Sequence, residues 1–132
     1  MNKSSEHDEQ VAVVDYLHER YPGVLFWSTP NGARLASGRG KQAGKLAAIR
    51  WFRLVAEGAL PGVSDLIIFE PRGGYSAMFV EMKRDDGGDG GSENQLWFLR
   101  QIEERGGFGV IAEGYEDAKT WIDSYLSGRT IK

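Results

Sequence analysis

The sequence from Pro61 to Lys83 reads PGVSDLIIFEPRGGYSAMFVEMK. It contains two apolar runs of strand length, Leu66–Phe69 and Ala77–Val80, which are typical of buried β-strands. Between them lie the turn-forming residues Pro71–Gly74. We therefore expect a β-hairpin at the centre of the domain, around which the rest of the chain is arranged.

The polar residues at the edges of this hairpin suggest its chemistry. Asp65 precedes the first apolar run, and Glu81 and Lys83 end the second. Because side chains alternate along a strand, Glu81 and Lys83 share one face, and antiparallel pairing brings Asp65 to the same end of the sheet. Two carboxylates and a lysine suit a hard cation such as Mg²⁺ and the phosphate of a substrate. Such a cation lowers the pKa of a coordinated water, and a lysine offsets developing charge.

The same residues also have a purely structural interpretation. Asp65 would cap a turn, and Glu81 with Lys83 would form an exposed ion pair worth under about 1 kcal/mol. A short Asp…Glu-x-Lys pattern also arises by chance. The hairpin alone therefore leaves both interpretations open.

Composition limits the classes of protein to consider. With 132 residues, 41% of them hydrophobic and 27% charged, the chain is expected to form one globular domain over residues 1–132. The absence of cysteine excludes disulfides and thiolate metal sites, and two histidines make a histidine zinc site improbable. The N-terminus lacks the apolar core of a signal peptide, and no apolar run approaches membrane-spanning length. We therefore expect a soluble, cytoplasmic protein.

Charge is distributed unevenly along the chain. The net charge is −3, but the segment from Asn31 to Ala56 carries six basic residues and no acidic one, which leaves the rest of the chain at −9. A basic segment on an acidic body is a candidate surface for DNA phosphates. A solvated helix face is the alternative interpretation. The candidate DNA-binding residues are Asn31, Arg34, Arg39, Lys41, Lys45, Arg50 and Arg53.

Hydrophobic periodicity and capping residues predict the remaining elements. Helices are expected at about 5–20, 45–57, 93–105 and 115–126, and further strands at about 24–28 and 108–112. In the first helix, Val11, Val14 and Leu17 are expected to face the core. The order of elements predicts an α/β domain in which helices cover a small mixed sheet with a central hairpin.

Two segments are expected to be flexible loops. One is the Gly-rich basic loop at about 32–44, which lacks the spacing of a nucleotide-binding P-loop. The other is the Gly/Asp-rich loop at about 84–94, which lacks the spacing of a calcium-binding EF-hand. We interpret its aspartates as solvated.

Several segments, taken together in their order and spacing, resemble the VRR-NUC (virus-type replication-repair nuclease) domain, a branch of the PD-(D/E)XK nuclease superfamily. They are SEHDEQ at 5–10, PNG at 30–32, the basic helix ending at Gly58, PGVSDLIIF at 61–69, FVEMK at 79–83 and SENQLWFL at 92–99. The resemblance covers nearly the whole chain and is closest to stand-alone phage and bacterial members. It implies a restriction-endonuclease-like core.

The resemblance also implies residue roles. The metal ligands would be Asp65, Glu81, Glu6 and the backbone carbonyl of Met82. Lys83 would position or activate the attacking water, and Gln10 and Gln95 would support the site. Glu9 competes with Glu6 for the helical position, because both lie in one turn. The chain departs from the family in the Gly/Asp-rich loop after Lys83, which puts the path of DNA past the site in doubt.

The activity that the resemblance implies is a Mg²⁺- or Mn²⁺-dependent endonuclease that hydrolyses phosphodiester bonds. The substrate would be branched DNA, such as a four-way (Holliday) junction, cut by a homodimer during DNA repair in a bacterial or phage-infected cell. A general or nicking duplex endonuclease and a catalytically silent DNA-binding module are the alternatives. Trp97, Trp121 and Tyr125 are candidate interface residues, although aromatic residues at helical spacing more often belong to a core.

Overall fold

The computed structural model describes residues 5–29, 41–85 and 91–128. Within these ranges the elements are α1 (Glu6–Arg20), β1 (Phe26–Ser28), α2 (Lys41–Ala56), β2 (Leu66–Ile68), β3 (Met78–Lys83), α3 (Glu93–Glu104), β4 (Phe108–Glu113) and α4 (Gly114–Leu126). Their types and order confirm the sequence prediction. One boundary was wrong, because α2 begins at Lys41 and the last residues of the expected basic loop are helical.

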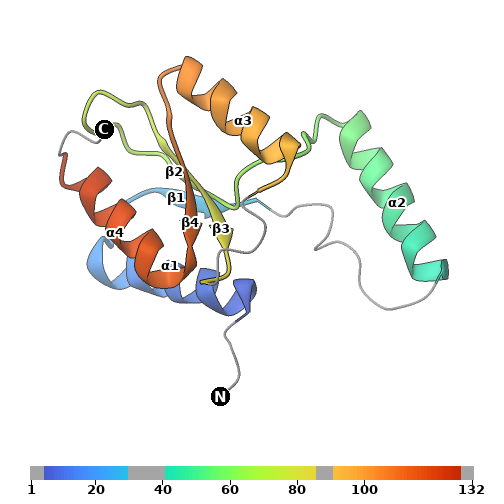
Figure 1. Ribbon diagram of the computed structural model, residues 1–132, viewed down its shortest axis with the longest axis horizontal. Coiled ribbons are helices and arrows are strands. Elements are labelled where there is room, and N and C mark those ends of the chain that lie inside the picture. Colours follow the sequence, from blue (N-terminus) through green and yellow to red (C-terminus); the bar gives the residue numbers. More distant parts are fainter. Residues whose placement is uncertain (1–4, 30–40, 86–90, 129–132) are drawn as a thin grey trace.

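The described strands form one mixed four-stranded sheet in the order β1-β2-β3-β4 (Figure 1). β2 and β3 pair antiparallel, which confirms the hairpin, and β4 joins β3 in parallel. The hairpin turn needs glycine, because Gly73 and Gly74 adopt φ values of 58° and 90°. The predicted hairpin therefore forms the middle of the sheet.

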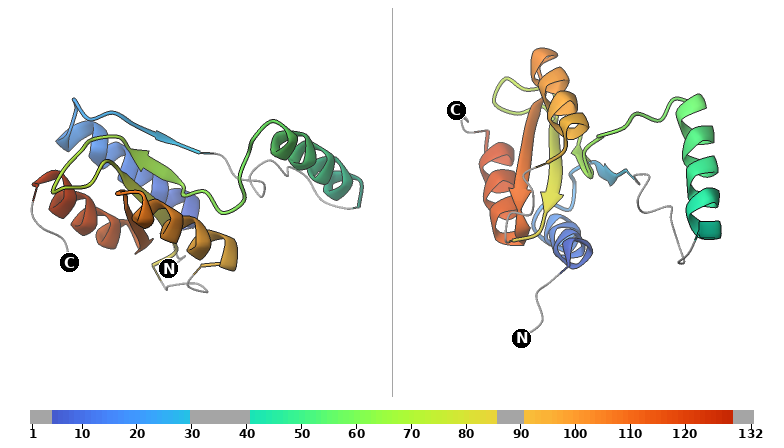
Figure 2. Two further views of the ribbon diagram at one scale, coloured as in Figure 1. Left: turned by 90° about the horizontal axis from the view of Figure 1, so that it is seen from above. Right: turned by 45° about the vertical axis from the view of Figure 1, so that its right-hand side comes forward.

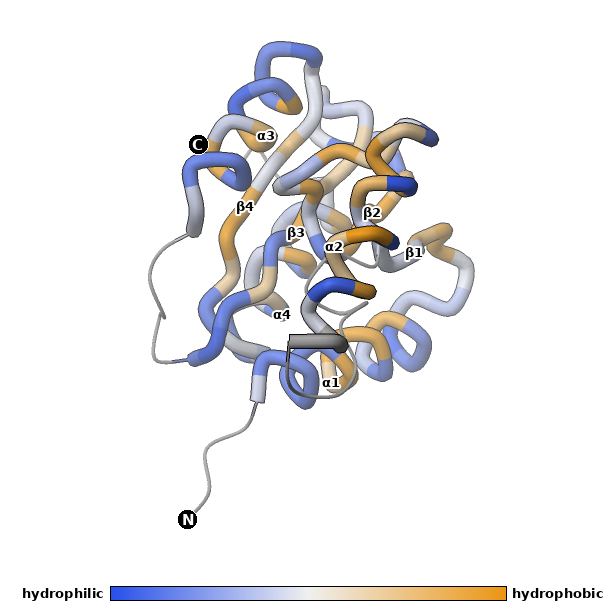
Figure 3. Tube along the Cα trace, turned by 90° about the vertical axis from the view of Figure 1, so that its right-hand side faces the viewer, coloured by the Kyte–Doolittle hydropathy of each residue, from blue (hydrophilic) through white to orange (hydrophobic). Residues whose placement is uncertain are grey.

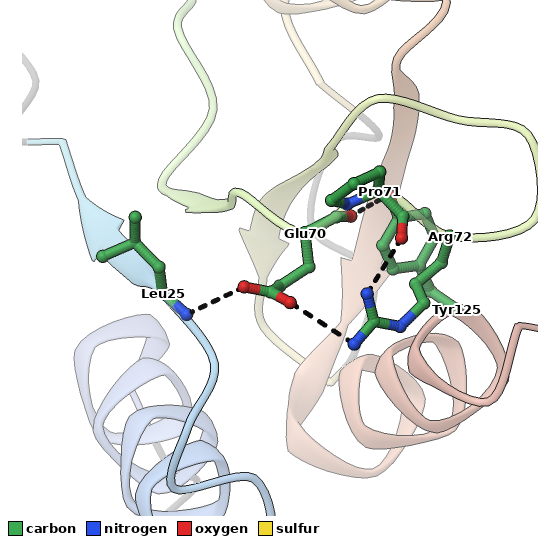
Figure 4. Close-up of polar contacts among 5 residues, drawn as sticks. All are labelled: Leu25, Glu70, Pro71, Arg72 and Tyr125. Atoms are coloured by element: carbon green, nitrogen blue, oxygen red, sulfur yellow. Dashed lines mark hydrogen bonds and ion pairs between the residues drawn. The ribbon is translucent and has the colours of Figure 1, made fainter.

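Glu70 fastens the connection that follows β2 (Figure 4). Its carboxylate accepts a hydrogen bond from the backbone N–H of Leu25 at 3.5 Å and pairs with the guanidinium of Arg72 at 3.3 Å. Its backbone carbonyl accepts a hydrogen bond from the Tyr125 hydroxyl at 2.6 Å. These contacts tie the hairpin to the chain before β1 and to α4.

Helices cover both faces of the sheet unequally. α1 and α4 lie on one face, and α3 lies on the other, over β3 and β4 (Figures 1 and 2). The side chains of Met78, Val80 and Met82 are fully buried on the α1/α4 face, as the alternation along β3 predicted. Tyr125 is also in this core, at 1% exposure, which agrees with the core position that its helical spacing indicated as the alternative to an interface.

The buried face of α1 differs from the predicted one. Val11 is 45% exposed, whereas Gln10, Val13 and Leu17 are buried. Each residue turns the helix by about 100°, so a core stripe through Gln10, Val13 and Leu17 leaves Val11 outside it, about 100° from Gln10. The prediction was wrong for Val11 because the stripe includes a polar residue that hydrophobic periodicity ignores.

Hydrogen bonds hold α1 against α4. The hydroxyls of Tyr16 and Tyr21 both donate to Asp123 Oδ1, at 2.5 and 2.7 Å. Burial and the hydrogen bond to Asp123 raise the pKa of both tyrosines, so both remain protonated donors. This contact fixes the C-terminal end of α1 against α4.

α2 stands apart from the sheet, so the expectation that helices cover the sheet fails for this one (Figures 1 and 2). Its large apolar side chains are solvent-exposed: 48% for Leu46, 53% for Ile49 and 81% for Phe52. None of the helices in the described ranges is long and apolar enough to cross a membrane.

Candidate active site

Two carboxylates meet at one end of the central hairpin, where both are almost completely buried. Asp65 is 1% exposed and directly precedes β2, and Glu81 is 2% exposed within β3. The pairing of Leu66 with Val80 sets the register that brings Asp65 opposite Glu81. Asp65 Oδ2 accepts a hydrogen bond from the Met82 backbone N–H at 2.8 Å, which fixes its orientation. The structure thus brings the predicted pair together.

Glu81 lies in an environment that disfavours its charge. Burial is the main cause that raises its pKa to about 8, and the negative charge of Asp65 is the next. Lys83 lowers this pKa, and the charge of Glu6 raises it. Within the described part of the chain, Glu81 Oε2 is buried without a hydrogen-bond donor. A buried carboxylate oxygen without a donor is a position suited to a cation.

Gln95 connects the carboxylate pair to the lysine. Its side-chain amide donates to Glu81 Oε1, and its Oε1 accepts from Lys83 Nζ at 3.1 Å. The same Oε1 accepts from the Ser92 backbone N–H at 2.8 Å, and the Gln95 N–H donates to Ser92 Oγ at 3.2 Å. Ser92 is the N-cap of α3, as predicted. The capping box that it forms with Gln95 therefore both starts the helix and positions the Gln95 side chain.

The structure separates the roles of the two glutamates in the first turn of α1. Glu9 is buried, and its carboxylate accepts a hydrogen bond from the Tyr115 backbone N–H at the start of α4. Glu6 lies close enough to Glu81 for its charge to raise that pKa. Gln10, one turn further along α1, is buried at 7% exposure. Glu6 is therefore the glutamate on the site side.

The donor set fits a hard cation with few protein ligands. Among the residues that the structure describes, no three Asp, Glu or His side chains gather closely enough to hold a metal ion. The site offers the carboxylates of Asp65 and Glu81. Mg²⁺ is typically bound by one or two carboxylates with water and substrate phosphate, and the Glu81 Oε2 atom without a donor suits it.

The candidate DNA-binding residues lie apart from this pair or outside the described residues. Asn31, Arg34 and Arg39 fall outside them, as does the side chain of Lys41, the first residue of α2. The side chains of three others are exposed on α2, namely Lys45, Arg50 and Arg53. Because α2 stands apart from the sheet, the structure does not bring these residues against the carboxylates.

Two supporting contacts were missed by sequence reasoning. Thr29 follows β1; its N–H donates to the Asp65 backbone carbonyl at 2.9 Å, and its hydroxyl donates to the Ser64 carbonyl. Antiparallel pairing of β1 with the hairpin would have identified it. The contact between Glu9 and Tyr115 joins residues more than a hundred positions apart. The sequence around each residue does not indicate that the two meet.

Comparisons with known proteins agree with this geometry. The VRR-NUC domain model matches residues 4–115. A solved structure described as a VRR_NUC domain protein is similar with a TM-score of 0.72 and 19% sequence identity, covering 100% of this chain and 96% of that one. At this identity the likeness concerns the fold. A search of curated proteins found no match. Since the family model spans most of the chain, this chain belongs to the VRR-NUC family of nuclease-type domains.

Proposed function

We propose that this nuclease-type domain is a Mg²⁺- or Mn²⁺-dependent endonuclease that hydrolyses phosphodiester bonds in branched DNA. The observation that carries the proposal is the buried pair of Asp65 and Glu81, with Lys83 linked to it through Gln95. Two buried carboxylates destabilise each other unless a proton or a cation compensates their charge, and a cation allows both to stay ionised. A silent DNA-binding module has no use for this arrangement.

Each residue has a distinct task in this proposal. The carboxylates of Asp65 and Glu81, with the Met82 carbonyl, would hold the cation, and Glu6 adds negative charge nearby. The cation, when bound, stabilises charge on the phosphoryl group and lowers the pKa of a coordinated water. Lys83 Nζ, held by Gln95, would hydrogen-bond to the attacking water or the phosphate oxygen and offset its charge.

The first test removes one carboxylate charge at a time. Asp65→Asn and Glu81→Gln should each lower cleavage by at least about a hundredfold, because each removes a charged ligand. DNA binding should remain, since both residues are buried. Cleavage of labelled DNA and a binding titration provide the two readouts. Glu93→Gln, an exposed acid in the first turn of α3, is the control. Full activity of either site variant would refute the metal site.

The substrate class is tested with a panel of DNA structures. Four-way junction, flap, single-stranded and linear duplex DNA would be compared in Mg²⁺, Mn²⁺ and EDTA. We expect metal-dependent cutting of branched DNA and loss of this cutting in Lys83→Ala. Equal cutting of all substrates would favour a general duplex endonuclease instead. Binding without cutting would favour the silent module.

The proposal includes a homodimer. The described part of the chain carries one buried carboxylate pair, and two strands at a symmetric junction require two such sites. A two-fold dimer supplies them in related positions.

A further inference from the structure

We propose that helix α2 of one copy packs against the exposed sheet face of a second copy, and that this reciprocal exchange forms the dimer. The proposal deepens the proposed function, which invokes a homodimer, by naming the two surfaces. It begins from a helix that has no packing partner among the described elements of its own chain.

The apolar surface of α2 is unusually wide. Leu46, Ile49, Phe52 and Val55 are 48%, 53%, 81% and 43% exposed. Steps of three residues shift the position around a helix by about 60°, so these four side chains span about 180° of its circumference. Figure 3 looks at the α2 side of the molecule and shows apolar segments along this helix. Most of the stability of a helix in a protein comes from packing of its apolar face, so this 16-residue helix needs a partner surface.

A matching surface lies on the sheet. α3 covers β3 and β4 on its face of the sheet and does not contact β1 or β2; Ile67 in the middle of β2 is buried, but other apolar side chains on this face are not. There Leu25, Trp27 and Phe69 are 56%, 44% and 55% exposed, and the rings of Trp27 and Phe69 lie 6.1 Å apart. We call these three residues the open sheet patch. One chain therefore carries both an uncovered helix and an uncovered sheet surface.

The link between α2 and the sheet favours a second copy over the chain's own sheet. The Ala59 N–H donates to the Leu54 carbonyl at 2.8 Å, which closes the end of the helix. Gly62 is packed against α3, since a Cβ there would lie 2.4 Å from the Asn94 backbone. Between them remain Leu60 and Pro61, and proline restricts the backbone of both residues. This stiff link holds α2 away from its own open sheet patch.

Charge also favours this pairing. α2 belongs to the basic segment, with six basic residues and no acidic one, whereas the rest of the chain carries −9. Lys45 and Arg53 lie within the apolar span of α2. Opposite net charges on two surfaces steer them together. The exchange is reciprocal, so it closes with two-fold symmetry.

The first test is the oligomeric state of the protein without DNA, by sedimentation velocity. Wild type should be a dimer, and Ile49→Asp with Phe52→Asp should be a monomer of unchanged melting temperature. Val11→Asp changes another exposed apolar residue, on α1, and should remain a dimer. A monomeric wild type, or a dimer that persists in the double variant, would overturn the proposal.

The second test identifies the two surfaces by cross-linking. The chain has no cysteine, so introduced thiols are the only ones. Mixing Phe52→Cys with Phe69→Cys and adding a short bismaleimide should give a covalent dimer of the two variants. Mixing Phe52→Cys with Val11→Cys should not. A chain carrying both Phe52→Cys and Phe69→Cys that cross-links only within itself would show that α2 covers its own sheet. Neither test uses DNA or metal, so either outcome is independent of whether the domain cleaves.

Discussion

At the scale of single residues, Glu81 determines how the site responds to pH. Its pKa in the folded protein is about 8, mainly because of burial and then because of Asp65. In the unfolded chain it titrates near the ordinary value of 4.5. Between these values the unfolded state holds fewer protons than the folded state, so stability falls as pH rises.

We therefore predict that the metal-free protein loses stability between pH 4.5 and pH 8 because of this group. Glu81→Gln should flatten this dependence, because it removes the titrating group. The measurement is the melting temperature of both proteins in EDTA across this range. Mg²⁺ should raise the melting temperature of wild type more at pH 8 than at pH 6, since the cation competes with the proton. Identical pH profiles for the two proteins would contradict the assignment.

Gln95 is the residue that couples the lysine to the carboxylate pair. Gln95→Leu removes the donor to Glu81 and the acceptor for Lys83. We expect cleavage and Mg²⁺ affinity to fall about 10- to 100-fold, as for other groups that orient metal ligands. Cleavage rates over a range of Mg²⁺ concentrations would measure both. Asn94→Ala, an exposed neighbour in the same helical turn, is the matched control. A normal Mg²⁺ dependence in Gln95→Leu would mean that this residue only caps α3.

At the scale of elements, Gly62 joins the start of β2 to α3. It has a φ of 85°, and a Cβ at this position would lie 2.4 Å from the Asn94 carbonyl carbon. Gly106 has a similar φ of 89° but no atom within 4 Å of such a Cβ. Because both glycines have a positive φ, replacing either by alanine costs a similar backbone strain energy. The difference between the two variants therefore measures the effect of close packing.

We predict that Gly62→Ala lowers the free energy of unfolding by about 1–3 kcal/mol more than Gly106→Ala, because the overlap is with backbone that cannot turn aside. Chemical denaturation of both variants measures the difference. If both variants lose the same free energy of unfolding, α3 shifts to accommodate the new methyl group without further destabilisation. Because Gly62 lies three residues before Asp65, cleavage should also fall more in Gly62→Ala.

The elements were predictable from sequence where local signals dominate. Ser92 and Gln95 form a capping box, and the alternation from Met78 to Met82 marks a strand, so α3 and β3 appeared where expected. The site pair was predictable because antiparallel register follows from the hairpin. The isolation of α2 was not, because apolar periodicity predicts a helix but not the surface that it contacts.

At the scale of the whole molecule, charge is separated between α2 and the body. Lys45, Arg50 and Arg53 are exposed on a helix that stands apart, while the body is acidic. This separation predicts that DNA phosphates contact the basic segment and that the acidic body contributes through the carboxylate site alone. Lys45 and Arg53 lie within the span from Leu46 to Val55 around the helix, and Arg50 lies about 40° beyond it, so a change at Arg53 bears on the dimer as well as on DNA, and sedimentation separates the two effects.

We predict that Arg50→Ala with Arg53→Ala weakens binding to all DNA structures and lowers the slope of log K against log salt by about 2, because each phosphate contact contributes about 0.9. Binding titrations at several salt concentrations measure the slope. Arg20→Ala with Arg105→Ala removes the same charge from exposed positions on α1 and just after α3 and is the matched control. Sedimentation checks that both variants keep their oligomeric state.

If the control pair changes the slope as much as the α2 pair, net charge rather than the basic segment governs DNA binding. If only the α2 pair changes it, the helix that stands apart from the sheet is a DNA-binding surface.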